Sequence, residues 1–346
     1  MSTYIIGEIG QNHNGSIEIA KAIIDIAAVK PEDRSFNTDL KPLDAVKLTK
    51  RDLNEELSDS QMKRPYTGRN SFGSTYGEHR AYLELSDEEH YELYKHTKGH
   101  GLDFVETLCS IGCLSLFKLF TPDRLKVASR DLTNLPLLNA MAETMVPIIL
   151  STGMGGKQEL DEALEIITKH HSEITILHCL SQYPAEYQNI NLNSIKALQQ
   201  QYSSYTIGYS DHSIGISIPL AAVALGAQVI EKHITLDRRM RGSDQYGSLG
   251  IDGLNRMVRD IRNLELAFGS TAIFKSEASH EAMEKLQRSI ATKRAMKKGE
   301  VIYENDVHLL SPGDGYQWRD RNEVFGRRLV NDIPQNEIIY PSMINE

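Results

Sequence analysis

Cysteine is scarce in this sequence, and long apolar runs are missing from it. The 346 residues include three cysteines, an odd number without paired spacing, at Cys109, Cys113 and Cys179. This pattern predicts free thiols in a reducing compartment, with Cys109 and Cys113 as packing residues. No stretch approaches the about 20 consecutive apolar residues of a membrane helix, and the first residues lack a signal-peptide pattern. We therefore expect a cytoplasmic protein that does not bind membranes.

Positive charge is also in deficit. The formal net charge is −9, which argues against a nucleic-acid surface because binding to a phosphate backbone requires net or clustered positive charge. The same balance still allows an anionic substrate to be held in a local basic pocket. Hydrophobic residues make up 40% of the chain, which is enough for a large core. The length suits a barrel of about 250 residues with a small additional module.

Short apolar segments alternate with amphipathic helical stretches along most of the chain. Near-continuous apolar strands separated by helices are typical of a buried parallel sheet. Eight such units predict a (β/α)8 barrel, a TIM barrel of the α/β class. A doubly wound open sheet is the alternative, but the first turn reads Gly7-x-x-Gly10 rather than a dinucleotide fingerprint. The predicted strands are 3–10, 44–50, 103–109, 124–129, 147–153, 173–180, 205–212 and 229–236.

Two parts of the sequence depart from this alternation. Residues 51–85, rich in Gly, Ser, Tyr and Arg, follow the second strand and are predicted to form a long loop that is functional or mobile. After Gly269 a polar connector leads into short strand-like runs with turn signals. We therefore predict a barrel domain over 1–270, a linker over 271–287 and a small β-rich domain over 288–346.

Two histidines end neighbouring predicted strands. His212 closes "IGYSDH" and His233 closes "VIEKH". The carboxyl ends of the strands line the active-site rim of TIM barrels. Because adjacent strands are about 4.8 Å apart, both imidazoles can reach one ion. This predicts a divalent-metal site with open positions for substrate, and the alternative is that each histidine is a hydrogen-bonded structural residue.

A second group of rim residues combines ammonium and hydroxyl groups. Lys47 and Lys126 lie within apolar strand sequence, where an unpaired charge would be costly, so we expect an anion beside them. Two lysines with nearby hydroxyls suit a phosphate or a carboxylate, and a Schiff base on one lysine is the alternative. The hydroxyl-bearing residues at this rim are Thr107, Ser110, Ser129, Ser151, Ser181 and Ser210.

Several motifs occur in an order that resembles the sialic acid synthase (N-acetylneuraminate synthase) family. They are "GEIGQNHNG", "AVKLTK", "PIILSTGM", "LHCLSQYP", "IGYSDHSIG" and "EKHIT". The C-terminal segment, with "RSIATKRAMKKGEVI", "PGDG" and "FGRRL", resembles the antifreeze-like (SAF, β-clip) domain that ends these synthases. The resemblance covers nearly the whole chain.

The resemblance implies a metal-dependent enzyme that condenses phosphoenolpyruvate with an N-acylated amino-sugar aldehyde. It implies His212 and His233 as ligands of Mn²⁺ or Mg²⁺, and a homodimer in which each SAF domain covers the partner's site. Substrate-binding roles go to Thr107, Ser110, Ser129, Ser151, Ser181 and Ser210. Catalytic roles go to Glu8, Lys47, Lys126, Tyr183 and Asp244, with Glu8 and Asp244 expected to contact the sugar.

The sequence departs from the family pattern at three positions. Ser311 stands where Arg or Lys often precedes Pro-Gly, Gln245 where histidine is frequent, and Ser181 where some members have asparagine. These departures leave the sugar open. N-acetylmannosamine is the default; its 6-phosphate, or a 2,4-diacetamido sugar leading to legionaminic or pseudaminic acid, is the alternative. Arg69, His79 and Arg80 are candidates to recognise such a group.

Two other functions are alternatives to this one. A heptulosonate- or octulosonate-type synthase would use related chemistry on a sugar phosphate, but the antifreeze-like domain argues against it. A non-catalytic sugar-binding or ice-interacting protein is the other rival, and the intact set of Lys47, Lys126, His212 and His233 argues against that reading.

Overall fold

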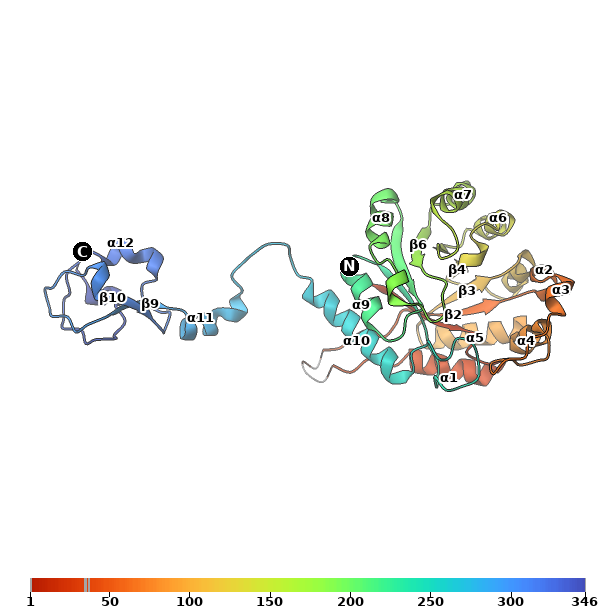
Figure 1. The fold of residues 1–346 in the computed structure, drawn as a ribbon, viewed down its shortest axis with the longest axis horizontal. Helices are drawn as coiled ribbons and strands as arrows, with labels where there is room; N and C mark the ends of the chain where they lie inside the picture. Colours follow the sequence, from red (N-terminus) through yellow and green to blue (C-terminus); the bar gives the residue numbers. More distant parts are fainter. Residues whose placement is uncertain (1, 34–35, 37, 346) are drawn as a thin grey trace. The chain divides into compact units, whose positions relative to one another are not determined.

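The computed structural model describes residues 2–33, 36 and 38–345 and divides the chain into two compact units. The first ends at Gly269 and the second begins at Ser270. The first unit is a closed barrel of eight parallel strands in chain order, with its helices arranged around the strands (Figure 1). The TIM-barrel prediction is therefore confirmed. In the described part of the chain, no helix combines the length and apolar character needed to cross a membrane.

Each observed strand lies inside its predicted segment. The strands are β1 (Tyr4–Gly10), β2 (Ala45–Lys50), β3 (Asp103–Leu108), β4 (Arg124–Val127), β5 (Ile148–Ser151), β6 (Ile174–Cys179), β7 (Thr206–Asp211) and β8 (Val229–His233). The covering helices are α1 (Ile17–Ala27), α5 (Asp87–Gly99), α6 (Leu135–Glu143), α7 (Lys157–Ile167), α8 (Ser194–Gln201), α9 (Ser217–Ala224) and α10 (Ile251–Ala267).

The two-residue period of the strands divides the barrel interior into an apolar layer and a polar layer. One cluster of buried side chains comprises Ile6, Ala45, Val105, Ile149, Leu177 and Val229. Two residues further along the same strands come Glu8, Lys47, Thr107, Ser151, Cys179 and Glu231, all of which line one cavity. Because side chains two apart on a strand share a face, the apolar layer forms the floor on which these polar groups stand.

The segment 51–85 is not the loop that its composition predicted. It contains three short helices, α2 (Leu53–Glu56), α3 (Asp59–Met62) and α4 (Tyr76–Leu83). A capping box starts α4, because the Thr75 hydroxyl accepts from the Glu78 N–H and the Glu78 carboxylate accepts from the Thr75 N–H. Phe72 stacks on Tyr82 with ring centroids 4.9 Å apart. Caps and aromatic packing therefore order a segment rich in residues typical of loops.

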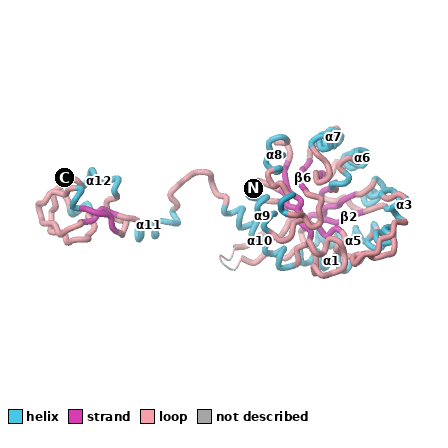
Figure 2. Tube along the Cα trace, viewed as in Figure 1, coloured by secondary structure: helices cyan, strands magenta, loops and turns pink. Residues whose placement is uncertain are grey.

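The second unit is small and largely irregular (Figure 2). It contains α11 (His280–Leu286), α12 (Arg321–Val324) and an antiparallel pair formed by β9 (Ser289–Thr292) and β10 (Val307–Leu310). Helix α11 lies inside the predicted linker, so that segment is helical in part. The core of the unit consists of Ile290, Met296, Ile302, Val307, Val324, Leu329, Ile333 and Ile339.

Candidate active site

The carboxyl ends of the barrel strands surround a cavity of about 400 Å³. All predicted site residues except Ser110 line it: Glu8, Lys47, Thr107, Lys126, Ser129, Ser151, Ser181, Tyr183, Ser210, His212, His233 and Asp244. Ser110 is buried, and its hydroxyl lies 3.3 Å from the Cys113 sulfur. The structure thus brings nearly all the predicted site residues to one cavity. Ser110 does not line this cavity and contacts Cys113 instead.

Two lysines and two glutamates form a buried charged cluster at the base of this cavity. The Lys47 ammonium lies 2.9 Å from a Glu8 oxygen and 3.8 Å from Glu231. The Lys126 ammonium lies 3.8 Å from the other oxygen of Glu231. All four residues are at most 5% exposed. Glu231 therefore pairs with both lysines. It was not among the predicted catalytic or substrate-binding residues.

Burial and pairing push the pKa values of the two glutamates apart. Burial raises the pKa of Glu8 to about 7, against the opposing charge of Lys47. Burial acts in the same direction on Glu231, but Lys126 and Lys47 outweigh it and lower the pKa of Glu231 to about 2. Carboxyl groups with well-separated pKa values in one site are a recurrent arrangement for proton transfer. Glu231 is thus the carboxyl held in its charged form, and Glu8 is the one whose pKa lies near neutral pH.

Hydroxyl groups surround the two ammonium groups. The Lys47 ammonium donates to Thr107 Oγ1 at 3.1 Å, and the Lys126 ammonium donates to Ser151 Oγ at 2.7 Å. Ser210 Oγ donates to Glu231 at 2.9 Å. These groups meet because the register places Thr107 beside Lys126 and Ser210 beside Glu231 on neighbouring strands.

A glycine keeps the neighbouring wall open. A Cβ atom at Gly153 would lie 2.5 Å from Ser181 Oγ and 2.8 Å from Ser129 Oγ. The Gly153 N–H also donates to Ser129 Oγ at 3.1 Å. Any side chain at this position would displace the two serine hydroxyls. Glycine is therefore favoured because the serine side chains lie so close to its Cα, and not because its φ angle is positive.

The two predicted metal ligands face the cavity with their rings 5.5 Å apart between centroids. His212 Nδ1 is 2.7 Å from the Leu180 carbonyl oxygen, which fixes a proton there and leaves Nε2 free. His233 is half-buried, and its buried Nδ1 has no hydrogen-bond partner among the described residues. Burial also lowers the pKa of His233, which favours the neutral, ligating form. The residues therefore fit a divalent ion held by two imidazoles.

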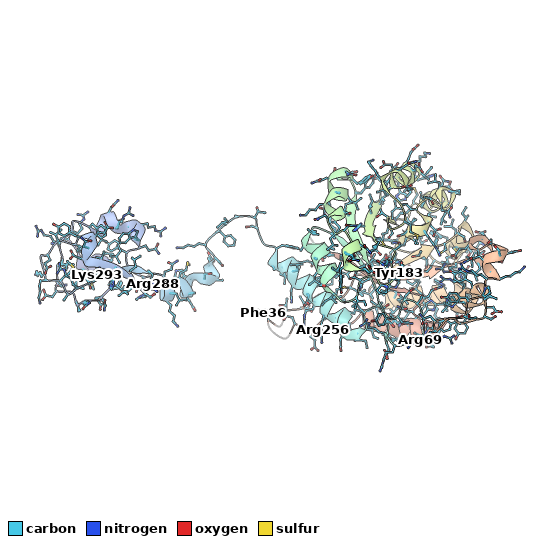
Figure 3. The ribbon with its side chains drawn as sticks, in the orientation of Figure 1. Phe36, Arg69, Tyr183, Arg256, Arg288 and Lys293 are labelled. Atoms are coloured by element: carbon cyan, nitrogen blue, oxygen red, sulfur yellow. The ribbon has the colours of Figure 1, made fainter. Side chains whose placement is uncertain are left out.

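Tyr183 and Asp244 border the same part of the cavity. Tyr183 lies near the middle of the barrel in Figure 3, with its ring centroid 4.0 Å from that of His212. Asp244 belongs to the segment after β8. That segment is held by Gln245, whose amide donates to the Asn12 carbonyl at 3.1 Å and to Asn14 Oδ1 at 3.2 Å. Gln245 is 1% exposed, so its role is to position the Asp244 segment rather than to contact a ligand.

Three arginines line the cavity, Arg51, Arg80 and Arg130, and of these only Arg80 was named as a candidate from the sequence. Arg51 and Arg130 both pair with the Glu56 carboxylate, at 2.5 and 2.8 Å. Arg80, from α4, contacts Gln11 and the Tyr76 hydroxyl and has no ion-pair partner among the described residues. Arg69 is exposed, does not line the cavity and lies at the edge of the barrel in Figure 3. Of the two arginines singled out from the sequence, Arg80 is thus the one that reaches the site.

The chain matches two families and several proteins of known name. Residues 41–272 match the NeuB family and residues 287–345 match the SAF domain. Human N-acetylneuraminate-9-phosphate synthase is 30% identical over 99% of this chain and 92% of its own length. N,N'-diacetyllegionaminic acid synthase of Campylobacter jejuni is 33% identical over 97% and 98%.

A solved structure supports the same assignment. The N-acetylneuraminic acid synthetase of Leptospira borgpetersenii, in complex with citrate, has a TM-score of 0.66 and 30% sequence identity, and the match covers 82% of this chain and 91% of that one. The resemblance drawn from the motifs is confirmed, and the relatives are synthases that form carbon–carbon bonds. The chain therefore belongs to the NeuB family of sialic acid synthases and carries a C-terminal SAF domain.

Proposed function

We propose that this synthase condenses phosphoenolpyruvate with N-acetylmannosamine, or a related N-acylated amino-sugar, to give a nonulosonic acid and inorganic phosphate. The observation that carries the proposal is the pair of buried lysines beside two imidazoles in one cavity. The two lysines suit an anionic enol substrate. The two imidazoles suit a metal ion that polarises a sugar aldehyde.

Phosphoenolpyruvate would bind between Lys47 and Lys126. Its phosphate and carboxylate would accept from the ammonium groups and from the hydroxyls of Thr107, Ser151 and Ser129, which already point into this part of the cavity. Glu231 opposes the effect of burial on the pKa of both lysines without occupying the substrate's place, because it lies 3.8 Å from each. Binding therefore adds an anion to a preorganised positive site.

His212 and His233 would hold a divalent ion, Mn²⁺ or Mg²⁺, at the sugar end of the cavity. When bound, such an ion supplies Lewis-acid polarisation of an aldehyde oxygen. Asp244 and Tyr183 border this region and would orient the open-chain sugar. In the reaction, C3 of phosphoenolpyruvate bonds to the aldehyde carbon and water adds to C2. The C2–O bond to phosphate then breaks. Glu8 would accept a proton from the water, and the aldehyde oxygen would take up a proton to become a hydroxyl.

The remaining parts of the proposal concern the second unit. We propose that the barrel spans 1–270, the linker 271–287 and the SAF domain 288–346, and that the protein is a homodimer in which each SAF domain covers the partner's cavity. Ser311 donates to the Leu286 carbonyl oxygen at 3.1 Å and brings no positive charge. A cationic contact to the sugar from this position is thus absent.

Arg80 favours a second candidate substrate, the 6-phosphate of the same sugar. Its guanidinium borders the cavity and pairs with no carboxylate in the described part of the chain, whereas Arg51 and Arg130 share Glu56. An unpaired guanidinium at the mouth of a site suits a phosphate ester. The human relative is named as a 9-phosphate synthase, which is consistent with this candidate.

A panel of aldehyde sugars tests the proposal. The full chain with phosphoenolpyruvate and Mn²⁺ should release phosphate only when an N-acylated amino-sugar is added, with the condensed acid seen by mass spectrometry. N-acetylmannosamine, its 6-phosphate and a 2,4-diacetamido sugar would be compared with erythrose 4-phosphate and arabinose 5-phosphate. Lys126→Met should raise the KM for phosphoenolpyruvate more than that for the sugar. Turnover of arabinose 5-phosphate alone, or a covalent lysine adduct after borohydride, would replace the proposal.

A further inference from the structure

A cluster of two histidines and one aspartate lies outside the cavity, between α1 and α5. Asp25 Oδ1 is 2.7 Å from His96 Nε2 and 2.9 Å from His100 Nε2. The two imidazole centroids are 5.0 Å apart with their planes at 77°. Within the described ranges, this is the one place where three His, Cys, Asp or Glu ligand atoms lie within 4.8 Å of one another.

The helices explain why these side chains meet. His96 and His100 are four residues apart at the C-terminal end of α5, so they project from the same face of the helix. Asp25 lies on α1, which packs against α5, and a Lys21–Glu92 ion pair of 2.5 Å joins the same two helices. None of the three residues lines the catalytic cavity. The cluster therefore serves something other than the condensation chemistry.

We propose that Asp25, His96 and His100 form a second metal site, which takes a borderline divalent ion such as Zn²⁺ with water in the fourth position. Two imidazole nitrogens and one carboxylate oxygen are a recognised zinc ligand set. Imidazole-rich sites prefer Zn²⁺ to Mg²⁺ or Mn²⁺. We therefore expect this cluster to select a different metal ion from the Mn²⁺ or Mg²⁺ proposed for the cavity.

The two nitrogen–oxygen separations require only a small adjustment, and the three ligand atoms already lie within 4.8 Å of one another. Bonds of about 2.0–2.1 Å in a tetrahedral site place ligand atoms about 3.3 Å apart. The observed nitrogen–oxygen separations of 2.7 and 2.9 Å must therefore open by about half an ångström. The side chains of His96, His100 and Asp25 are 30%, 35% and 54% exposed, so solvent and an ion can reach them and no core packing opposes the shift. Such an ion would join α1 to α5 on the outside of the barrel.

The alternative is that Asp25 only accepts hydrogen bonds from the two imidazoles, and the variants below separate the two readings. Asp25→Asn keeps an oxygen acceptor and removes the charged ligand, while His96→Gln and His100→Gln each remove an imidazole. His280→Gln is the control, because His280 is an exposed histidine in the second unit, beside a glutamate four residues on.

The test is Zn²⁺ titration of the metal-stripped full chain by isothermal calorimetry, with far-UV circular dichroism to verify folding. The wild type should bind one more equivalent of Zn²⁺ than Asp25→Asn, His96→Gln or His100→Gln, or bind it at least about 100-fold more tightly, since even losing an outer-shell partner costs 10–100-fold. The control should match the wild type, and Co²⁺ should give a tetrahedral visible spectrum that the three variants lose. Equal stoichiometry and affinity in all five proteins would overturn the proposal.

Discussion

Lys232 and Asp211 form an ion pair that is fully removed from water, and breaking it should be one of the costliest single changes in the barrel. The Lys232 ammonium is 2.5 Å from Asp211 Oδ2, and both side chains are 0% exposed. The segment that they hold contains Ser210 and His212, and Lys232 adjoins His233. We therefore expect Lys232→Met to destabilise the barrel and to disturb the cavity together.

The expected magnitude follows from what remains around Asp211. Removing one partner of a buried pair costs about 3–5 kcal/mol, because the other charge is left uncompensated. Asp211 keeps hydrogen bonds of 3.0 Å from the Tyr209 hydroxyl, the Ser213 N–H and the Ser213 hydroxyl. These bonds to a charged acceptor retain part of its stabilisation, so we expect the lower end, about 3 kcal/mol. That corresponds to a fall in Tm of about 6–12 °C for a unit of this size.

The chain provides its own assay control. Its single tryptophan, Trp318, lies in the second unit, so tryptophan fluorescence follows that unit while far-UV circular dichroism is dominated by the helices of the barrel. Lys232→Met should lower the dichroism midpoint and leave the fluorescence midpoint in place.

Lys98→Met is the matched control variant. Lys98 pairs with Asp123 at 2.9 Å, with the two side chains 36% and 30% exposed, and its loss should cost less than about 1 kcal/mol. The double change Asp211→Asn, Lys232→Met should recover stability relative to Lys232→Met. If Lys232→Met cost no more than Lys98→Met, the reasoning from burial would be refuted.

Three further predictions concern the cavity and its support. Glu231→Gln should lower kcat by about 100-fold or more, because two buried lysines lose their shared counter-charge, and sugar-dependent phosphate release measures it. Arg80→Ala should raise the KM for a sugar 6-phosphate and leave that for phosphoenolpyruvate unchanged, with Arg69→Ala as the exposed control; equal effects of the two would contradict the assignment. Burial lowers the pKa of His13 to about 3, so its stabilising contribution is complete above pH 6.5 and declines as the pH falls towards 3, by about 1.4 kcal/mol per pH unit. His13→Asn should flatten this acid-side slope in denaturant titrations, and an unchanged slope would contradict it.

The strands and most of the cavity could be predicted because one local rule determines both. In a barrel strand, alternate residues share a face, so an apolar residue at one position and a polar one two further on mark the floor and the site, as in Ile6 and Glu8 or Ala45 and Lys47. Glu231 follows the same rule after Val229. Its role could not be predicted from the sequence, because its link to both lysines depends on closure of β8 onto β1.

The arginines at the cavity, of which only Arg80 was named from the sequence, depend on longer-range structure. Arg51, Arg80 and Arg130 reach the cavity only because α2 brings Glu56 between two of them and α4 carries the third. The sequence of 51–85 indicated a loop, and the signal that was overlooked was the Thr75-x-x-Glu78 capping box. Similarly, the departure at Gln245 left the sugar open, and the hydrogen bonds of Gln245 to the Asn12–Asn14 turn could not be predicted from the sequence.

Cavity residues on strands and cavity residues outside the strands have different consequences for function. The layer of Glu8, Lys47, Lys126 and Glu231 stands on strands, so its geometry is fixed by backbone register and is suited to the chemistry that the whole family shares. The arginines and Asp244 stand outside the barrel strands, on segments where sequence can change without disturbing the barrel. The choice among N-acylated sugars should therefore be governed by those segments. Exchanging Arg80, rather than any strand residue, is the change expected to alter which sugar is accepted while phosphoenolpyruvate binding persists.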